Sequence, residues 1–163
     1  MKTIFLVRHA KSDWEADYGE DHERPLAGRG RKAARRLGRL VAGSGRVPDR
    51  IISSTAVRAR TTVQIAAEEG GWGVDIALDG GLYGAGVQTI LSRARDLPDH
   101  VQSVMFVGHE PGWSHAVSAL SGGGSVRMPT ACLAQIDFDV ETWEDVRMGT
   151  GVLQALIPPK ALD

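Results

Sequence analysis

The amino-acid sequence predicts an α/β fold, a three-layer sandwich in which helices flank a largely parallel central sheet. Two features of the sequence lead to this prediction. Short apolar runs at 3–8, 50–53 and 103–107 have the length and composition of buried strands. Amphipathic stretches with helical spacing separate these runs, and this alternation is typical of parallel sheets that are covered by helices.

The first two helices are indicated by apolar residues that recur every three or four positions. One helix is expected over about 28–43, where a Gly-Ser-Gly segment follows it. A second helix follows the strand at 50–53 and is stopped by Gly70 and Gly71. The first of these helices connects the strands at 3–8 and 50–53, as a crossover in a parallel sheet requires.

The later part of the chain continues the same alternation. The clearest helical stripe runs over 87–97 and precedes the strand at 103–107. Pro111 then opens a further helix, at a position where the missing N–H of proline does no harm. Two final strands are expected over 131–138 and 151–157.

Length, composition and charge limit the class of protein. The 163 residues suffice for one domain spanning 1–163 with its own core. The formal net charge of −1 gives no overall field that would attract nucleic acid or an anionic membrane, so we expect neither as a partner. Cys132 is the only cysteine, which excludes an internal disulfide and a thiolate zinc site. With no signal peptide or membrane span in the pattern, we expect a cytoplasmic protein.

Two histidines follow strands, and each stands where a parallel sheet places its ligands. Arg8 and His9 come at the end of the strand at 3–8, and His109 follows the strand at 103–107. Ligands of such sheets bind outside the carboxyl ends of the strands, so these side chains are expected to meet in one crevice. The alternative is that each histidine merely ends a strand.

Arginines near the same edge could bind an anion. Arg58 lies in the first turn of the helix after the strand at 50–53, where a cation disfavours the helix and an anionic ligand would explain it. Arg24 stands in a charged loop from which it could reach the crevice. Solvated side chains are the alternative for both arginines. Glu110 is a possible proton donor, or simply a partner of a helix dipole.

The glycine-rich run at 121–125 is expected to be a flexible turn. It lacks the lysine and the spacing of a phosphate-binding P-loop. His115, in the helix before it, is interpreted as a surface or packing residue.

The sequence resembles the histidine phosphatase superfamily, and within it the SixA-type phosphohistidine phosphatases. Four segments carry the resemblance, in order along the chain: LVRHAKSDW (6–14), ERPLAGRGRKAA (23–34), IISSTAVRARTT (51–62) and MFVGHEPG (105–112). The resemblance implies a phosphoglycerate mutase-like fold, with His9 as the nucleophile. It implies that Arg8, Arg58 and His109 complete a phosphate pocket, to which Arg24 contributes. No metal or other cofactor is implied.

One feature of the larger branches of that superfamily cannot be placed here. They carry a proton-donating carboxylate between the second arginine and the second histidine, and the segment DGGLYGAG (79–86) has no glutamate for that role. Because an alkoxide leaving group needs an acid and an imidazole leaves more readily, the missing carboxylate favours phosphohistidine as the substrate.

The expected function is therefore hydrolysis of phosphohistidine on a partner protein, through a covalent phosphohistidine enzyme. A neutral His9 would attack, with its other ring nitrogen donating to a backbone acceptor, while bound phosphate would hold His109 as a cation. Two alternatives remain open: a small-molecule phosphomonoester phosphatase of the same superfamily, and a non-catalytic module that binds phosphate or a phosphoprotein. A mutase is disfavoured because the chain offers no insertion for a lid. The oligomeric state is not indicated.

Overall fold

The computed structural model describes residues 1–162, except for the side chain of residue 160, so the predicted domain boundary at 163 lies just outside the described residues. The sheet consists of β1 (Lys2–Arg8), β2 (Arg50–Ser53), β3 (Ile76–Leu78), β4 (Ser103–Gly108), β5 (Leu133–Phe138) and β6 (Val152–Ile157). The α-helices are α1 (Gly28–Gly43), α2 (Val57–Gly70), α3 (Val87–Arg95) and α4 (Gly112–Leu120). Short 3-10 turns are η1 (Asp21–Glu23), η2 (Gly80–Leu82), η3 (Trp143–Asp145) and η4 (Pro159–Leu162).

The six strands form one mixed sheet in the order β3-β2-β4-β1-β5-β6. The strands β1 to β4 are parallel to their neighbours among themselves, whereas β5 runs antiparallel to β1 and β6 runs antiparallel to β5. The predicted α/β sandwich is confirmed, and its parallel part consists of β1 to β4, which α1, α2 and α3 connect. The chain between β5 and β6 has no α-helix, so these strands pair antiparallel, which needs no crossover.

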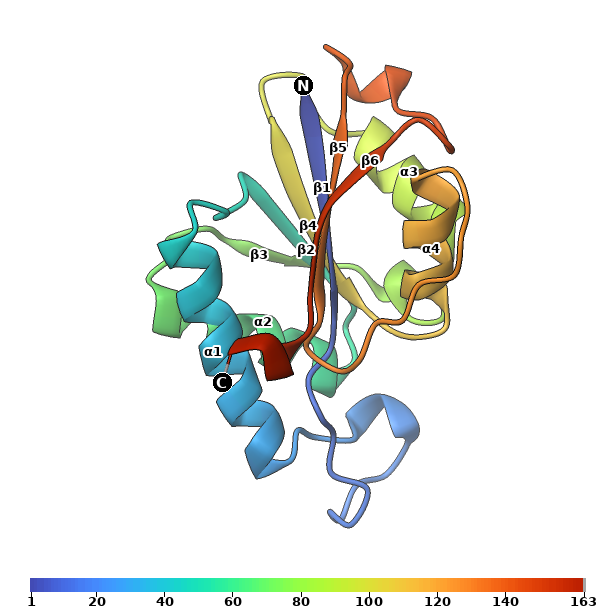
Figure 1. Ribbon diagram of the computed structural model, residues 1–163. Helices are drawn as coiled ribbons and strands as arrows, with labels where there is room; N and C mark the ends of the chain where they lie inside the picture. Colours follow the sequence, from blue (N-terminus) through green and yellow to red (C-terminus); the bar gives the residue numbers. More distant parts are fainter. Residues whose placement is uncertain (163) are drawn as a thin grey trace.

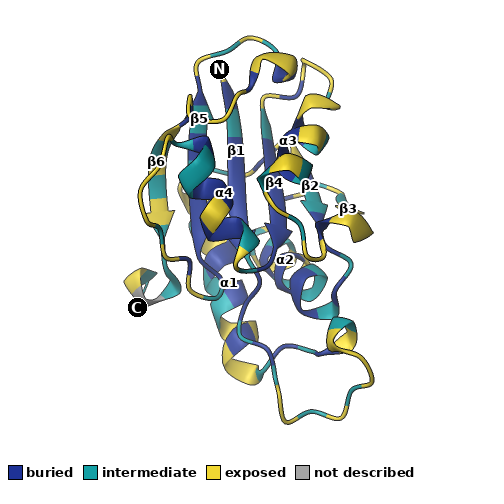
Figure 2. Cartoon of the chain, turned by 90° about the vertical axis from the view of Figure 1, so that its right-hand side faces the viewer, coloured by how far each residue is buried: buried dark blue, intermediate teal, exposed yellow. Residues whose placement is uncertain are grey.

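The helices cover both faces of the sheet (Figure 1). Alternate residues of β1 point to opposite layers: Ile4 and Leu6 pack with α3 and α4, whereas Phe5 and Val7 pack with α1 and α2. The central strands are accordingly buried along most of their length, while the outer faces of the helices are exposed (Figure 2). This double burial explains why the strands appear in the sequence as continuous apolar runs.

The carboxyl ends of β1, β2 and β4 lie side by side at one edge of the sheet. Arg8, the last residue of β1, is paired with Gly108, the last residue of β4. The backbone N–H groups of His9 and Ser54 extend the ladder beyond the strands and donate to carbonyls of β4 at 3.0 and 2.9 Å. Since His109 follows Gly108 directly, both strand-end histidines stand at this edge, as the sequence predicted.

The start of α4 is packed against the end of β4. A Cβ atom on Gly108 would lie 2.4 Å from the indole ring of Trp113, so only glycine permits this approach. The helix begins at Gly112, one residue later than predicted, and Pro111 occupies the position that precedes its first turn. The tight packing fixes the short connection that carries His109.

The sequence did not predict β3. This edge strand has three residues, of which Ala77 and Leu78 are exposed, so it shows neither a buried run nor an alternating pattern. No helix in the described part of the chain is long and apolar enough to cross a membrane.

Candidate active site

A pocket of about 210 Å³ opens at the carboxyl ends of the parallel strands. Its lining includes the five residues predicted for the phosphate site and also Glu110, the possible proton donor. The other lining residues come from the loop after β1 and from the loop before β5. The lining residues are Arg8, His9, Lys11, Ser12, Trp14, Arg24, Arg58, His109, Glu110 and Thr130.

His9 is fixed in one orientation inside this pocket. Its Nδ1 lies 2.7 Å from the carbonyl oxygen of Ala10, and because a carbonyl only accepts, Nδ1 carries the proton and donates it. The N–H of Ala10 in turn donates to the hydroxyl of Thr62 at 2.9 Å, which ties the turn to α2. The other ring nitrogen, Nε2, is left with a free lone pair, as expected for a nucleophile.

His9 is neutral in the protein. Burial is the main cause that lowers its pKa from 6.5 to about 4. The hydrogen bond to Ala10 opposes this shift, and the charges of Arg58, Arg8 and Arg24 lower the pKa further. The unprotonated ring is the form that can attack an electrophile. The predicted neutral state of His9 therefore has a physical basis in the pocket itself.

His109 lies beside His9, with the two ring centroids 5.3 Å apart. Its Nε2 lies 2.8 Å from the hydroxyl oxygen of Ser54, whereas its Nδ1 is buried without a hydrogen-bond partner. Burial, followed by the proximity of His9 and Arg58, lowers the pKa of His109 to about 3. Without a bound anion both histidines are therefore neutral, and a cationic His109 requires a phosphate group to raise its pKa.

Three arginines surround the histidines. Arg58 and Arg24 are each only 5% exposed and both are paired with the carboxylate of Asp21, at 2.9 and 2.8 Å. Arg58 also donates to the backbone carbonyl of Asp21 at 2.7 Å. Arg8 donates to the carbonyl of Met128 at 3.0 Å, which holds its side chain toward the loop before β5.

Unpaired nitrogen atoms are concentrated on the residues that line this pocket. Across the described side chains, the buried nitrogen and oxygen atoms without any hydrogen-bond partner are Nε of Arg8, Arg24 and Arg58 and Nδ1 of His109. Buried polar atoms are almost always paired, so four exceptions on residues that line one pocket need an explanation. An anion that accepts hydrogen bonds from several of these residues would supply the missing partners and neutralise the arginines.

Asp21 lies in the charged loop before α1, and although its side chain is 48% exposed it binds two residues of the pocket. Its carboxylate bridges Arg24 and Arg58 and accepts a hydrogen bond of 2.7 Å from the hydroxyl of Tyr83. The hydrogen bond from Tyr83, then that from Arg24, holds the pKa of Asp21 far below its usual value. Asp21 thus stays ionised and cannot serve as a proton donor near neutral pH.

Tyr83 belongs to the segment in which no glutamate could be found. Its ring meets His109 edge to face with centroids 5.4 Å apart, and it meets His22 in the same way at 5.1 Å. Its hydroxyl donates to Asp21, which raises the pKa of Tyr83 and keeps its proton in that hydrogen bond. No feature of the sequence alone would have connected Tyr83 with a loop some sixty residues earlier.

Glu110 has a structural role that matches one of its two predicted interpretations. Its carboxylate accepts a hydrogen bond of 2.7 Å from the backbone N–H of Ser114 in the first turn of α4. No cluster of three or more potential metal ligands occurs among the described residues.

Comparison of the sequence with known proteins gives a matching family model and related proteins. The model of the histidine phosphatase superfamily (branch 1) matches residues 4–85. An uncharacterised chloroplastic protein of Arabidopsis thaliana is 30% identical and aligns with 97% of this chain and 78% of its own length. An uncharacterised protein of Mycobacterium tuberculosis is 31% identical, with 94% of this chain and all of the relative aligned.

Solved structures extend the likeness to the fold. A candidate phosphohistidine phosphatase SixA from Agrobacterium tumefaciens is 31% identical, with a TM-score of 0.80 over 97% of this chain and 98% of that one. A candidate SixA from Nakamurella multipartitia is 26% identical, with a TM-score of 0.83 and coverage of 97% and 96%. A protein histidine phosphatase SixA in complex with tungstate is 22% identical and has a TM-score of 0.85 with 99% of each chain covered, which shows the shared fold.

Proposed function

We propose that this chain hydrolyses phosphohistidine on a partner protein. The premise is that the chain belongs to the histidine phosphatase superfamily and is a phosphatase. The observation that carries this proposal is the state of His9. One ring nitrogen donates to the Ala10 carbonyl, the other is free and unprotonated, and three arginines with unpaired Nε atoms line the same pocket.

The reaction would proceed in two displacements at phosphorus. The lone pair on Nε2 of His9 forms a bond to phosphorus while the bond to the leaving group breaks, and the leaving group departs with that electron pair. Water then attacks the phosphohistidine enzyme, the bond to Nε2 breaks, and inorganic phosphate leaves. The hydrogen bond from Nδ1 to Ala10 is retained throughout and keeps the attacking lone pair in place.

Fixed cations would stabilise the negative charge on the phosphoryl oxygens. Arg8, Arg24 and Arg58 present planar donor groups that bind such oxygens in pairs, which a lysine cannot do equally well. His109 has a buried Nδ1 with no partner, so a phosphoryl dianion would raise its pKa and stabilise the protonated ring. A tungstate-bound SixA of the same fold is consistent with an oxyanion site, since tungstate has the tetrahedral shape of phosphate.

The states of Asp21 and Tyr83 favour a nitrogen leaving group. Asp21 is ionised and the proton of Tyr83 is held by Asp21, so neither residue protonates an alkoxide as it departs. A positioned acid commonly contributes about 10²- to 10⁴-fold to such a step. The imidazole of phosphohistidine avoids the need, because a ring that is protonated on its second nitrogen leaves as a neutral molecule.

The test compares wild-type protein with His9→Ala, using a phosphohistidine peptide, an aryl phosphate and glycerol phosphate as substrates. We expect His9→Ala to lose turnover of the peptide by at least about 10³-fold while its affinity for inorganic phosphate, measured by calorimetry, changes by no more than a few-fold. His115→Ala is the matched control, because His115 is an exposed histidine of α4 outside this pocket.

Each alternative has its own outcome. If wild-type protein binds phosphate but turns over none of the three substrates, the pocket belongs to a binding module. Should glycerol phosphate turn over as fast as the aryl phosphate, the chain would be a phosphomonoester phosphatase with an acid that the proposal overlooks.

A further inference from the structure

Trp14 differs from every other residue that lines the pocket. All the others contribute charged or polar side chains, namely Arg8, His9, Lys11, Ser12, Arg24, Arg58, His109, Glu110 and Thr130. Trp14 alone presents an aromatic hydrocarbon surface, and 64% of it is exposed. Such a large exposed aromatic group at the rim of a polar pocket suggests a contact with the part of the substrate that is not phosphate.

The position of Trp14 is fixed by its neighbours. The guanidinium carbon of Arg24 lies 3.6 Å from the centroid of the indole ring, so one face of the indole is stacked on the arginine. Arg24 is itself held, because it donates to the hydroxyl of Ser12 and to the carboxylate of Asp21. The loop is also tied at its base, since the N–H of Asp13 donates to a backbone carbonyl across the loop at 2.8 Å.

The exposed part of Trp14 lies at the mouth of the pocket, on the side from which a leaving group would depart. Attack by His9 requires the leaving group on the opposite side of phosphorus, and the phosphoryl oxygens are surrounded by the arginines and His109. The leaving group therefore points out of the pocket toward its mouth. Since one face of the indole covers Arg24 and most of the side chain remains exposed, the other face is free for a second planar group.

We propose that Trp14 determines leaving-group specificity by stacking on a planar ring, such as the imidazole of a phosphohistidine. This inference rests on the proposed function and narrows its substrate class to phosphoryl groups carried on flat, unsaturated rings. Leaving groups without a ring gain nothing from the indole, although they use the same histidine and arginines. Aromatic contacts of this kind contribute enough to change a rate constant roughly three- to tenfold.

The experiment compares two substrates with the same type of scissile bond. N-phosphoimidazole and phosphoramidate both break a P–N bond and form the same phosphoenzyme, but only the first has a ring. We expect Trp14→Ala to lower kcat/KM for phosphoimidazole roughly three- to tenfold and to leave kcat/KM for phosphoramidate within about twofold of wild type. Trp14→Phe keeps an aromatic face and should retain most of the preference.

A matched control and the contrary outcomes separate this inference from the proposed function. Tyr18→Ala removes an aromatic residue from the same loop but outside the pocket lining, and should change neither substrate. An equal loss on both substrates would show that Trp14 only holds Arg24, and no loss on phosphoimidazole would show that the indole does not touch the leaving group. Either result overturns the inference while wild-type turnover still supports a phosphatase; if wild-type protein hydrolyses neither compound, the proposed function fails as well.

Discussion

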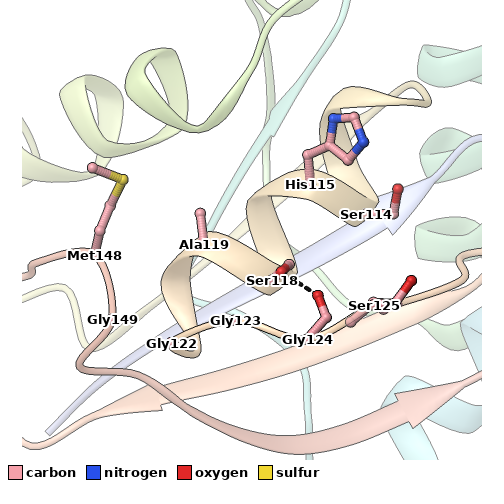
Figure 3. Close-up of a pocket in the computed structure, with 11 residues that line it drawn as sticks. Ser114, His115, Ser118, Ala119, Gly122, Gly123, Gly124, Ser125, Met148 and Gly149 are labelled. Atoms are coloured by element: carbon pink, nitrogen blue, oxygen red, sulfur yellow. Dashed lines mark hydrogen bonds between the residues drawn. The ribbon is translucent and has the colours of Figure 1, made fainter.

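Two pockets of the molecule differ in size and in chemistry. The larger one, about 630 Å³, lies between α4 and the glycine-rich segment after it, and its lining includes His115, Ser118 and Met148 (Figure 3). No lysine, arginine, aspartate or glutamate is among its lining residues, as far as the described chain shows. The pocket of His9 is about 210 Å³ and contains three arginines and two histidines.

The two pockets also differ in how their polar groups are satisfied. In the larger pocket the hydroxyl of Ser118 donates to the backbone carbonyl of Gly124, as Figure 3 shows, and none of its buried side-chain polar atoms lacks a partner among the described residues. The unpaired donors all belong to the smaller pocket. Volume alone would point to the wrong place, whereas charge and unsatisfied hydrogen bonds point to the strand ends.

The largest effect expected from comparing the two pockets is on kcat/KM, when one residue of each pocket is replaced. Arg58→Ala removes a buried donor of the smaller pocket and should lower kcat/KM for a phosphohistidine peptide about 10²- to 10³-fold, as for the loss of one donor that stabilises developing charge. Ser118→Ala in the larger pocket should leave kcat/KM unchanged. Steady-state kinetics on both variants checks the prediction. Comparable losses from the two substitutions would mean that the larger pocket also takes part in the reaction.

The stability of the folded protein should depend on pH because of the two histidines in the smaller pocket. The pKa of His9 is about 4 and that of His109 about 3, whereas an unfolded histidine titrates near 6.5. Between these values the unfolded chain binds protons that the folded protein does not, so stability is fully present above pH 6.5 and declines as the pH falls. The decline is at most about 1.4 kcal/mol per pH unit for each histidine.

Urea unfolding at pH 7.5, 6.5, 5.5 and 4.5 measures this slope. His109→Gln should show a shallower decline below pH 6.5 than wild type, because one of the two buried rings no longer titrates. Identical slopes would contradict the lowered pKa of His109. Titration of the His109 ring by NMR with and without inorganic phosphate should then show its pKa rising when phosphate binds.

The smallest effect concerns the carboxylate that faces the arginines. Asp21→Asn removes the negative charge that now pairs with Arg24 and Arg58, so inorganic phosphate should inhibit roughly three- to tenfold more strongly. The effect should shrink at high salt because the Asp21 side chain is 48% exposed. Asp79→Asn, which disrupts a pair with Arg93 outside the pocket, is the control. Unchanged or weaker inhibition would show that Asp21 does not compete with phosphate.

The sequence predicted the part of the site that depends on strand ends. Arg8, His9 and His109 could be located because the end of a buried apolar run is visible in the sequence, and parallel strands bring such ends together. Arg58 was indicated by its unfavourable position at a helix start. The structure brings all of them to one pocket, together with Arg24.

The residues that the sequence did not reveal are those defined by long-range contacts. Asp21 and Tyr83 meet across 62 positions, and the hydroxyl of Ser54 meets His109 across 55. Each is a common polar residue in a loop or at a strand end, where a solvated side chain is the usual outcome. The antiparallel orientation of β5 and β6 was missed for a similar reason, since direction in a sheet is set by how the chain returns rather than by local pattern.

Rapid-quench trapping shows whether His9 carries the phosphoryl group during turnover. Wild-type protein is mixed for milliseconds with a ³²P-labelled phosphohistidine peptide, quenched, and examined for label bound to the chain. We expect an acid-labile, base-stable label that maps to His9, is absent in His9→Ala and is retained in His115→Ala. Normal consumption of the peptide by His9→Ala, or label on a different residue, would contradict this expectation.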